Sequence, residues 1–244
     1  MEGVLPVVRV IGPGRAGLSL SRALARAGWD VLAPLGRGDD VQGAADGTDV
    51  VVIATPDAVV AGVAAAIDPV PTTAVVHLAG SLGLDVLAPH ARRASVHPLV
   101  ALPDRYLGAV RLVGAWYAVA GDPVARAIVS DLHGRALFVD DQSRVSYHAA
   151  ACIASNHLVA LLGQVERVAA DAGVPLAAYL DLVRATVENV AALGPAAALT
   201  GPVARGDWDT VQRHLDAIDP EERAAYSALA DLASHLAGEH DEAE

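Results

Sequence analysis

A glycine-rich turn between an apolar strand and an apolar helix constrains this chain more than any other feature. Residues 7–24 read VVRVIGPGRAGLSLSRAL. In that pattern Gly12 permits a tight turn, Gly14 lets the backbone approach a pyrophosphate, and Gly17 lets the helix pack closely on the strand. The free N–H groups and the positive dipole end of the helix then face the phosphates. The stretch predicts a dinucleotide site, with a purely structural turn as the alternative.

The end of the second predicted strand indicates which dinucleotide is bound. That strand covers residues 29–34 and is followed closely by Arg37. An acidic residue at this point holds the ribose 2′-hydroxyl of NAD, whereas an arginine accommodates the 2′-phosphate of NADP. The sequence therefore favours NADP(H), with Arg37 on the 2′-phosphate. In the alternative, Arg37 is a solvated loop charge and Asp39 or Asp40 takes the ribose.

Two further predicted strands end beside the cofactor. Residues 49–55 form a near-continuous Val/Ile run, which suits a parallel strand covered on both faces. Pro56 then starts a helix that Thr55 could cap. Residues 73–78 form the next strand, and ligands of doubly wound sheets bind at the carboxyl ends of strands. The residues expected at the cofactor are Gly12, Pro13, Gly14, Arg15, Ala16, Gly17, Arg37, Thr55, Pro56, Asp57, Ala79, Gly80 and Ser81.

The alternation of strands and helices stops near Gln142, and a purely helical pattern follows. The last elements expected before that point are the strand 116–120, the helix 123–133 and the strand 135–139. The helices expected after it cover 143–172, 176–193, 208–217 and 221–237. The sequence predicts an α/β fold, with an N-terminal Rossmann-like doubly wound sheet in residues 1–141 and an all-α C-terminal domain for substrate and dimerisation in residues 142–244.

Charge and composition exclude several classes of protein. The formal net charge is −12, which disfavours a nucleic-acid or anionic-membrane partner. Cys152 is the only cysteine, so neither an internal disulfide nor a multi-cysteine metal site is possible, and no metal is expected. All 17 basic residues are Arg, which excludes a catalytic lysine. No signal-peptide pattern opens the sequence and no stretch is judged long enough to span a membrane, so a cytoplasmic protein is expected.

Three polar residues in otherwise apolar segments are the expected catalytic groups. His97 lies in an extended segment at the carboxyl edge of the sheet. His148, Cys152, Ser155 and Asn156 are spaced so that they share a broad face of the long helix. Asn156 could hydrogen-bond a substrate carbonyl and the alcohol it becomes, while His148 supplies the proton. The alternative is structural, with Asn156 bridging helices and the histidines satisfied in the core.

Substrate contacts are expected from the segment 198–207, ALTGPVARGD. A turn at Gly201 precedes Asp207, which is placed to cap the next helix. Thr200 and Arg205 are the substrate-binding residues expected here, together with Ser155 on the long helix. Arg205 is suited to a carboxylate because a guanidinium grips that group with two parallel hydrogen bonds.

Six motifs along the chain carry a family resemblance: GPGRAG, IATPD, HLAGS, SVHPL, YHAAACIASNHLVALL and LTGPVARGDWDTVQRHL. Together they resemble a bacterial family of Rossmann-like proteins with a helical domain of formerly unknown function, the DUF2520 type. Its superfamily includes ketopantoate reductases, 6-phosphogluconate dehydrogenase-like β-hydroxyacid dehydrogenases and F420-dependent NADP reductases. Some DUF2520-type members look like alternative ketopantoate reductases. The resemblance implies NADPH-dependent reduction of 2-dehydropantoate to (R)-pantoate in pantothenate biosynthesis.

The chain departs from ordinary ketopantoate reductases at one position. Those enzymes place a lysine about one turn before the helix asparagine, whereas the residue four before Asn156 is Cys152. A thiol cannot supply the fixed charge and proton of an ammonium group. Either His148, His97 or a water molecule protonates the developing alkoxide, or the reaction is a different one.

The working hypothesis is a homodimeric NADPH-dependent reductase of a small 2-oxoacid, most consistent with ketopantoate. A dimer through the helical half is expected because the long apolar helix exceeds what one small domain needs to cover. Two alternatives stay open. The site could instead be that of an imine reductase or β-hydroxyacid reductase, or of an F420-dependent NADP reductase, which acts on a deazaflavin. Alternatively, the chain could be a non-catalytic NADP(H)-sensing partner protein.

Overall fold

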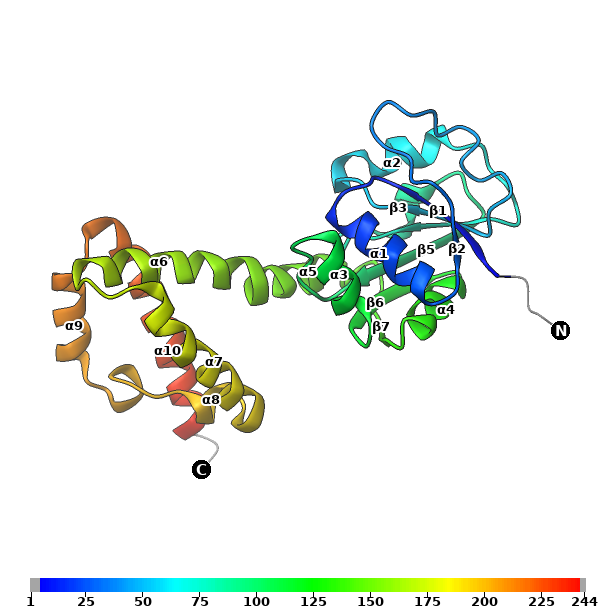
Figure 1. Cartoon of the computed structure of the whole chain (residues 1–244). Helices are drawn as coiled ribbons and strands as arrows, with labels where there is room; N and C mark the ends of the chain where they lie inside the picture. Colours follow the sequence, from blue (N-terminus) through cyan, green and yellow to red (C-terminus); the bar gives the residue numbers. More distant parts are fainter. Residues whose placement is uncertain (1–4, 242–244) are drawn as a thin grey trace. The chain divides into compact units, whose positions relative to one another are not determined.

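The computed structural model describes residues 5–241 (Figure 1). The chain divides into two compact units, Met1–Ser155 and Asn156–Glu244. This division falls later than the boundary expected after Asp141, because side chains of the first helix of the helical run, α5 (Arg144–Cys152), contact the sheet of the first unit.

The first unit is built on a seven-stranded sheet of order β2-β1-β3-β4-β5-β6-β7. All neighbouring strands are parallel except β5 and β6, which are antiparallel. The strands are β1 (Val7–Ile11), β2 (Asp30–Val31), β3 (Val50–Ile53), β4 (Ala74–His77), β5 (Arg92–Pro98), β6 (Trp116–Gly121) and β7 (Arg135–Phe138). The predicted Rossmann-like sheet followed by a helical region is confirmed.

Helices cover both faces of this sheet, as a doubly wound fold requires (Figure 1). One face packs against α1 (Arg15–Arg26), α3 (Arg105–Leu112) and α4 (Val124–Asp131). The other packs against α2 (Asp57–Ala66) and the 3-10 turn η1 (Leu84–Leu87). Because β3 and β4 are covered on both sides, every one of their residues is buried.

The register of the parallel strands brings their carboxyl ends to one edge. Ile11 is paired with Ile53, Ile53 with His77, and His77 with Ser95. The glycine turn, the loop before α2, the loop after β4 and the end of β5 therefore meet at the same edge of the sheet. This edge positions the candidate site.

The second unit is entirely helical. Its elements are α6 (Leu158–Asp171), α7 (Leu176–Leu193), α8 (Pro195–Ala198), η3 (Val203–Arg205), α9 (Trp208–Ala217) and α10 (Pro220–Asp241). Helix α7 begins after Pro175 and ends before Gly194, in agreement with the sequence, because both residues interrupt helices. Asp207 caps α9 as expected, and its carboxylate accepts from the Thr210 backbone N–H at 3.1 Å.

Three local predictions are wrong. The uninterrupted helix over 143–172 is broken by a π-helical segment, η2 (Ile153–His157), so Ser155 and Asn156 leave the angular phase that a regular α-helix would give them. Thr55 does not cap α2, and its buried hydroxyl has no partner among the described residues. The strand expected at 29–34 has only two residues in regular pairing, and Pro34 lacks the N–H that a longer ladder needs.

The helical run Arg144–Asp171 also corrects an expectation about membranes. It is 28 residues long, and its most apolar window has a mean hydropathy of 1.3, so by length and composition it could cross a membrane. The expectation that no stretch is long enough is therefore wrong. One such helix is weak evidence for a membrane span, because apolar helices that pack against protein meet the same criterion.

Candidate functional site

The three glycines of the first turn have three different surroundings. Gly12 has a φ of +101°, and a Cβ there would lie 2.7 Å from the Ala54 carbonyl oxygen. A Cβ on Gly17 would overlap the Gly12 carbonyl oxygen, so α1 packs on the turn only because this residue has no side chain. Gly14 has no atom within 4 Å of the corresponding position. The turn is thus closed on the protein side and open beside Gly14, where a phosphate can approach.

A cavity of about 820 Å³ lies beside this turn, in the first unit. Its walls come from the glycine turn, from the 36–39 loop after β2, and from the loop after β3 together with α2. The predicted cofactor residues that line it are Gly12, Pro13, Gly14, Arg37, Thr55 and Pro56. Its size and mainly apolar walls suit a ligand pocket.

The remaining predicted cofactor residues do not line this cavity. Arg15, Ala16 and Gly17 form the first turn of α1, while Asp57 is the first residue of α2. Ala79, Gly80 and Ser81 follow β4. The Ser81 hydroxyl donates to Asp57 Oδ2 at 3.1 Å and so joins the loop after β4 to the start of α2.

The charges in the 36–39 loop favour an anionic ligand. Asp39 Oδ2 accepts from the Gly36 backbone N–H at 2.7 Å, and Asp40 Oδ1 accepts from the Gln42 N–H at 2.9 Å. Both carboxylates are therefore engaged in the turns of their own loop. Arg37 is exposed, lines the cavity and forms no ion pair with another described residue. A guanidinium in this position suits a 2′-phosphate.

A second group of polar side chains forms where β5 meets α5. His97 lies near the carboxyl end of β5, and its Nδ1 is 2.7 Å from the Tyr147 hydroxyl oxygen. The His97 and His148 rings meet edge to face, with centroids 5.7 Å apart. On its other side His148 Nε2 lies 3.6 Å from Cys152 Sγ, one helical turn further along α5. The structure therefore brings together the two predicted histidines and adds Tyr147.

Gly80 connects this group to the loop after β4. A Cβ on Gly80 would lie 3.0 Å from His97 Nε2 and would overlap His148 Nδ1. Only glycine permits such an approach of backbone to two imidazoles. Because the loop after β4 borders the carboxyl edge of the sheet, His97 Nε2 is presented to the edge at which ligands of this fold bind.

The local environment keeps both partners of the His97–Tyr147 pair neutral. Burial lowers the pKa of His97 to about 4, and the nearby His148 and Arg144 act in the same direction. Burial raises the pKa of Tyr147, which keeps the phenol protonated, although Arg144 opposes this effect. At neutral pH the pair therefore consists of an uncharged imidazole and an intact phenol.

Sequence reasoning missed a buried polar layer beneath α5. His77, Ser95 and Arg144 are each fully buried, and polar side-chain atoms of all three have no hydrogen-bond partner among residues 5–241. Arg144 Nε lies 3.4 Å from Asp141 Oδ1 without the alignment of a hydrogen bond. Burial lowers the pKa of Arg144, while Asp141 opposes that change. The position of His77 at the end of a buried Val-rich strand was a signal that its side chain is buried. The position of Arg144 at the start of a helix gave no such signal.

The buried histidines should make the first unit acid-sensitive. The pKa of His77 is lowered to about 4, chiefly by burial, as is that of His97. Between pH 6.5 and pH 4 these histidines are protonated in the unfolded chain and stay neutral in the folded chain. Their contribution to the free energy of unfolding is therefore complete above about pH 6.5 and decreases as the pH falls below that value. We expect a loss of about 2 kcal/mol per histidine between pH 8 and pH 5.

Urea unfolding at pH 8 and pH 5 measures this loss. The His77→Leu variant should lose about 2 kcal/mol less than the wild type between the two pH values. The control is His235→Gln, since His235 is exposed and should leave the difference unchanged. An equal loss in wild type and His77→Leu would show that His77 titrates normally.

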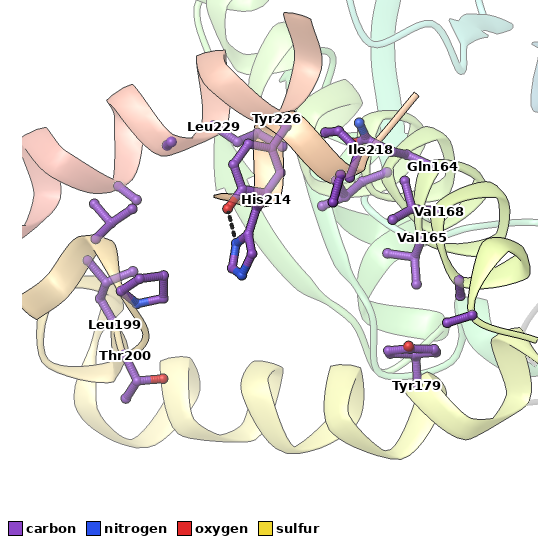
Figure 2. A pocket seen from close by; sticks show the side chains of 18 residues that line it. Gln164, Val165, Val168, Tyr179, Leu199, Thr200, His214, Ile218, Tyr226 and Leu229 are labelled. Atoms are coloured by element: carbon purple, nitrogen blue, oxygen red, sulfur yellow. Dashed lines mark hydrogen bonds between the residues drawn. The ribbon is translucent and has the colours of Figure 1, made fainter. Parts of the chain in front are cut away.

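Four predicted site residues remain, of which Ser155 belongs to the first unit and Asn156, Thr200 and Arg205 belong to the second. Ser155 and Asn156 are exposed side chains of the π-helical segment. Thr200 lines an apolar hollow of the helical unit (Figure 2), whereas Arg205 is an exposed residue of η3. Among the described residues no group of three His, Cys, Asp or Glu side chains is placed to hold a metal ion.

Comparison with known proteins supports an oxidoreductase fold. Residues 117–233 match the family profile described as a domain of unknown function, DUF2520. No curated protein matches the chain. BF3122 of Bacteroides fragilis, described as a candidate NADP oxidoreductase, has a TM-score of 0.78 at 19% identity, covering 95% of this chain and 98% of that one.

Two further solved structures are similar over almost the whole chain. TM1727 of Thermotoga maritima has a TM-score of 0.72 at 22% identity, with 96% of this chain and 99% of that chain covered. A reductive aminase of Aspergillus terreus has a TM-score of 0.70 at 14% identity, with 99% and 100% covered. Residues 117–233 thus match the DUF2520 model, and the chain shares its fold with these three solved structures.

Proposed function

We propose that this protein is an NADPH-dependent reductase of a small 2-oxoacid, with ketopantoate as the substrate. The observation that carries the proposal is the contact of Gly80 with His97 and His148. It brings a proton-transfer group to the loop after β4, at the same strand edge as the glycine turn and the Arg37 cavity. A reductase needs this combination of a dinucleotide site and a proton donor at one edge.

The residues of the first unit fit NADPH. The turn is open beside Gly14, and Arg37 lines the adjacent cavity. The backbone N–H groups at the start of α1 would hold the pyrophosphate, and Arg37 would hold the 2′-phosphate. When bound, NADPH supplies a hydride to the substrate carbonyl carbon. The protein must then give a proton to the oxygen that becomes an alcohol.

His97 and Tyr147 supply that proton in our mechanism. When Nδ1 accepts from the Tyr147 hydroxyl, the neutral imidazole carries its own proton on Nε2, the nitrogen that faces Gly80. His97 Nε2–H donates to the developing alkoxide and loses its proton to it, while Nδ1 takes the Tyr147 proton. The imidazole stays neutral throughout, and water restores the phenol. No lysine is required, which accounts for Cys152 standing where ordinary ketopantoate reductases have one.

The choice of ketopantoate rests on the motif resemblance described above. A 2-oxoacid also needs a cation for its carboxylate, and we assign this role to Arg205, with Asn156 orienting the carbonyl oxygen and Ser155 and Thr200 as further contacts. The strongest support for these four residues is their residue type and their place in the shared motifs.

The experiment is the loss of NADPH absorbance on mixing the protein with ketopantoate, with pyruvate and 2-oxoisovalerate as comparison substrates. Oxidation with ketopantoate alone would support the proposal. Tight NADPH binding without oxidation by any of the three would refute the 2-oxoacid assignment and favour the NADP(H)-sensing alternative.

An Arg37→Ala variant tests the cofactor assignment in the same assay. Loss of a phosphate-binding guanidinium should raise the KM for NADPH by about ten- to a hundredfold, the effect of a charge-assisted hydrogen-bonded pair. The KM for NADH should stay within about twofold, since NADH has no 2′-phosphate. Equal changes in the KM for NADPH and the KM for NADH would show that Arg37 does not contact the 2′-phosphate.

A further inference from the structure

We propose that Arg144 is a positioning residue that supplies the positive charge balancing the phenolate formed by Tyr147 during proton transfer. The inference rests on the proposed function, because it adds a residue to the relay formed by His97 and Tyr147. All three residues belong to the first unit. Arg144 does not line the cofactor cavity, so its role is separate from cofactor binding.

The relay produces an anion in each turnover. His97 Nε2 gives its proton to the alkoxide oxygen, and Nδ1 takes the proton of the Tyr147 hydroxyl across the 2.7 Å contact. The imidazole keeps its charge, and Tyr147 becomes a phenolate. A water molecule then gives a proton to the phenolate and leaves as hydroxide, so one proton is taken from solvent. Because burial disfavours a charged group, this step needs a positive charge nearby.

Arg144 lies on the part of α5 that faces the relay. It precedes Tyr147 by three residues and His148 by four, so the three side chains share one face of the helix. Its side chain is fully buried. On the sheet below, His97 of β5 and the buried His77 of β4 point to the same face, because Ser95, two residues before His97, is paired with His77.

The charge of Arg144 is not matched by a structural ion pair of good geometry. Asp141 Oδ1 lies 3.4 Å from Nε without the alignment of a hydrogen bond, and all three guanidinium nitrogens lack a hydrogen-bond partner among residues 5–241. The Asp141 side chain is 47% exposed and accepts from the Leu84 backbone N–H at 3.1 Å. Buried polar groups with a purely structural role have their hydrogen bonds satisfied, and exceptions of this kind are typical of functional sites.

The electrostatic effects agree with this role. Burial has the largest influence on the relay, lowering the pKa of His97 and raising that of Tyr147, whereas Arg144 lowers both pKa values. The guanidinium therefore disfavours an imidazolium and favours a phenolate, as a neutral relay requires. Asp57, at the start of α2, opposes the effect of Arg144 on His97. Burial lowers the pKa of Arg144 and Asp141 opposes that change, but a guanidinium keeps its proton at neutral pH.

The kinetic experiment places Arg144→Met in two backgrounds. In the wild type, kcat should fall about ten- to a hundredfold, somewhat less than the loss of a direct oxyanion-hole donor, while the KM for NADPH stays within about twofold. In the His97→Asn, Tyr147→Phe background no phenolate forms, so Arg144→Met should lower kcat by less than about threefold. The control is Arg26→Met, since Arg26 is exposed on α1 and should leave kcat within about twofold.

A second measurement needs no substrate. The difference in phenolate absorbance between a protein and its own Tyr147→Phe variant follows the titration of Tyr147 alone, and circular dichroism reports the pH range in which both are folded. Arg144→Met should raise the pKa of Tyr147, because a positive neighbour is lost. An unchanged pKa would refute the inference even in an active reductase. A raised pKa in a protein that reduces none of the 2-oxoacids would refute the substrate assignment and leave the charge pairing standing.

Two kinetic results would overturn the inference. One is a kcat of Arg144→Met within about twofold of the wild type. The other is a loss as large in the relay-deficient background as in the wild type, which would assign Arg144 to packing or to substrate binding. If Arg144→Met does not fold, Arg144→Lys decides at pH 6, where the ammonium supplies the charge. Its kcat should lie within about threefold of the wild type, and a larger loss in a folded variant would refute the role.

Discussion

Replacing Tyr147 with Phe is expected to lower kcat for NADPH-dependent reduction by about a hundredfold, the usual contribution of a positioned proton donor. The reason is the 2.7 Å contact between the Tyr147 hydroxyl and His97 Nδ1. Without the phenol, proton donation from His97 Nε2 would leave an imidazolate, which is a far poorer product. In the proposed mechanism Tyr147 is therefore a positioning residue that acts through His97.

His97→Asn should have an effect of the same size, and the double variant should be little worse than either single one. Groups that act as one relay give strongly non-additive losses, whereas two independent structural roles would multiply. The control is Tyr106→Phe, since Tyr106 is exposed on α3 and should leave kcat within about twofold of the wild type.

The pH profile separates this relay from an ordinary histidine acid. Burial lowers the pKa of His97 to about 4 and raises the pKa of Tyr147, so neither group changes charge between pH 6 and pH 9. We expect a flat kcat over that range. A kcat that falls tenfold for each unit above pH 6.5 would show that an imidazolium is the donor, and the neutral relay would then be wrong.

The order of elements was predictable from local chemistry. The strand 50–53 is a run of Val and Ile, and its two covered faces explain both the run and the parallel pairing. Helix α7 begins after Pro175 and ends before Gly194, and Asp207 caps α9 through its own side chain. In each case the cause lies within a few residues of the effect, so one sequence is sufficient to find it.

The features that were missed depend on contacts between distant segments. The helix α3 was not foreseen, and the direction of β6 against β5 has no local signature. Arg144 is three residues from Asp141 in sequence, but its complete burial depends on the sheet beneath α5. The π-helical segment at Ile153–His157 was not predicted either, because Ser155 and Asn156 are weak helix formers but nothing in the local sequence specifies a π-helical turn.

For the candidate site, the sequence supplied the residue types and the structure supplied their grouping. His97 and His148 were both predicted, yet their shared contact with Gly80 requires that β5, α5 and the loop after β4 converge. Tyr147 stood in the same motif as His148, and only the distance to His97 gives it a role. Burial, which sets the pKa values of these groups, is likewise a property of the folded chain.

Replacing Gly17 with Ala should destabilise the first unit by about 3 kcal/mol, at the upper end of overpacking effects. The added methyl group would overlap the Gly12 carbonyl oxygen and approach Val10 Cγ1 to 3.1 Å and Ala54 Cβ to 3.2 Å. The oxygen is backbone, held in a turn where Gly12 has a φ of +101°, so it cannot rotate away as a side chain would. Helix α1 must therefore move off the strand.

Gly14→Ala is the matched substitution that separates packing from binding. Gly14 has a φ of −78°, which alanine adopts freely, and no atom lies within 4 Å of its missing Cβ. Its free energy of unfolding should stay within about 0.5 kcal/mol of the wild type, whereas its Kd for NADPH should rise about tenfold or more, because the methyl group occupies the approach to the pyrophosphate. Urea unfolding and NADPH fluorescence titration measure the two effects. A Gly14→Ala variant that binds NADPH normally would refute the dinucleotide site at this turn, because the open space beside Gly14 would then have no ligand to receive.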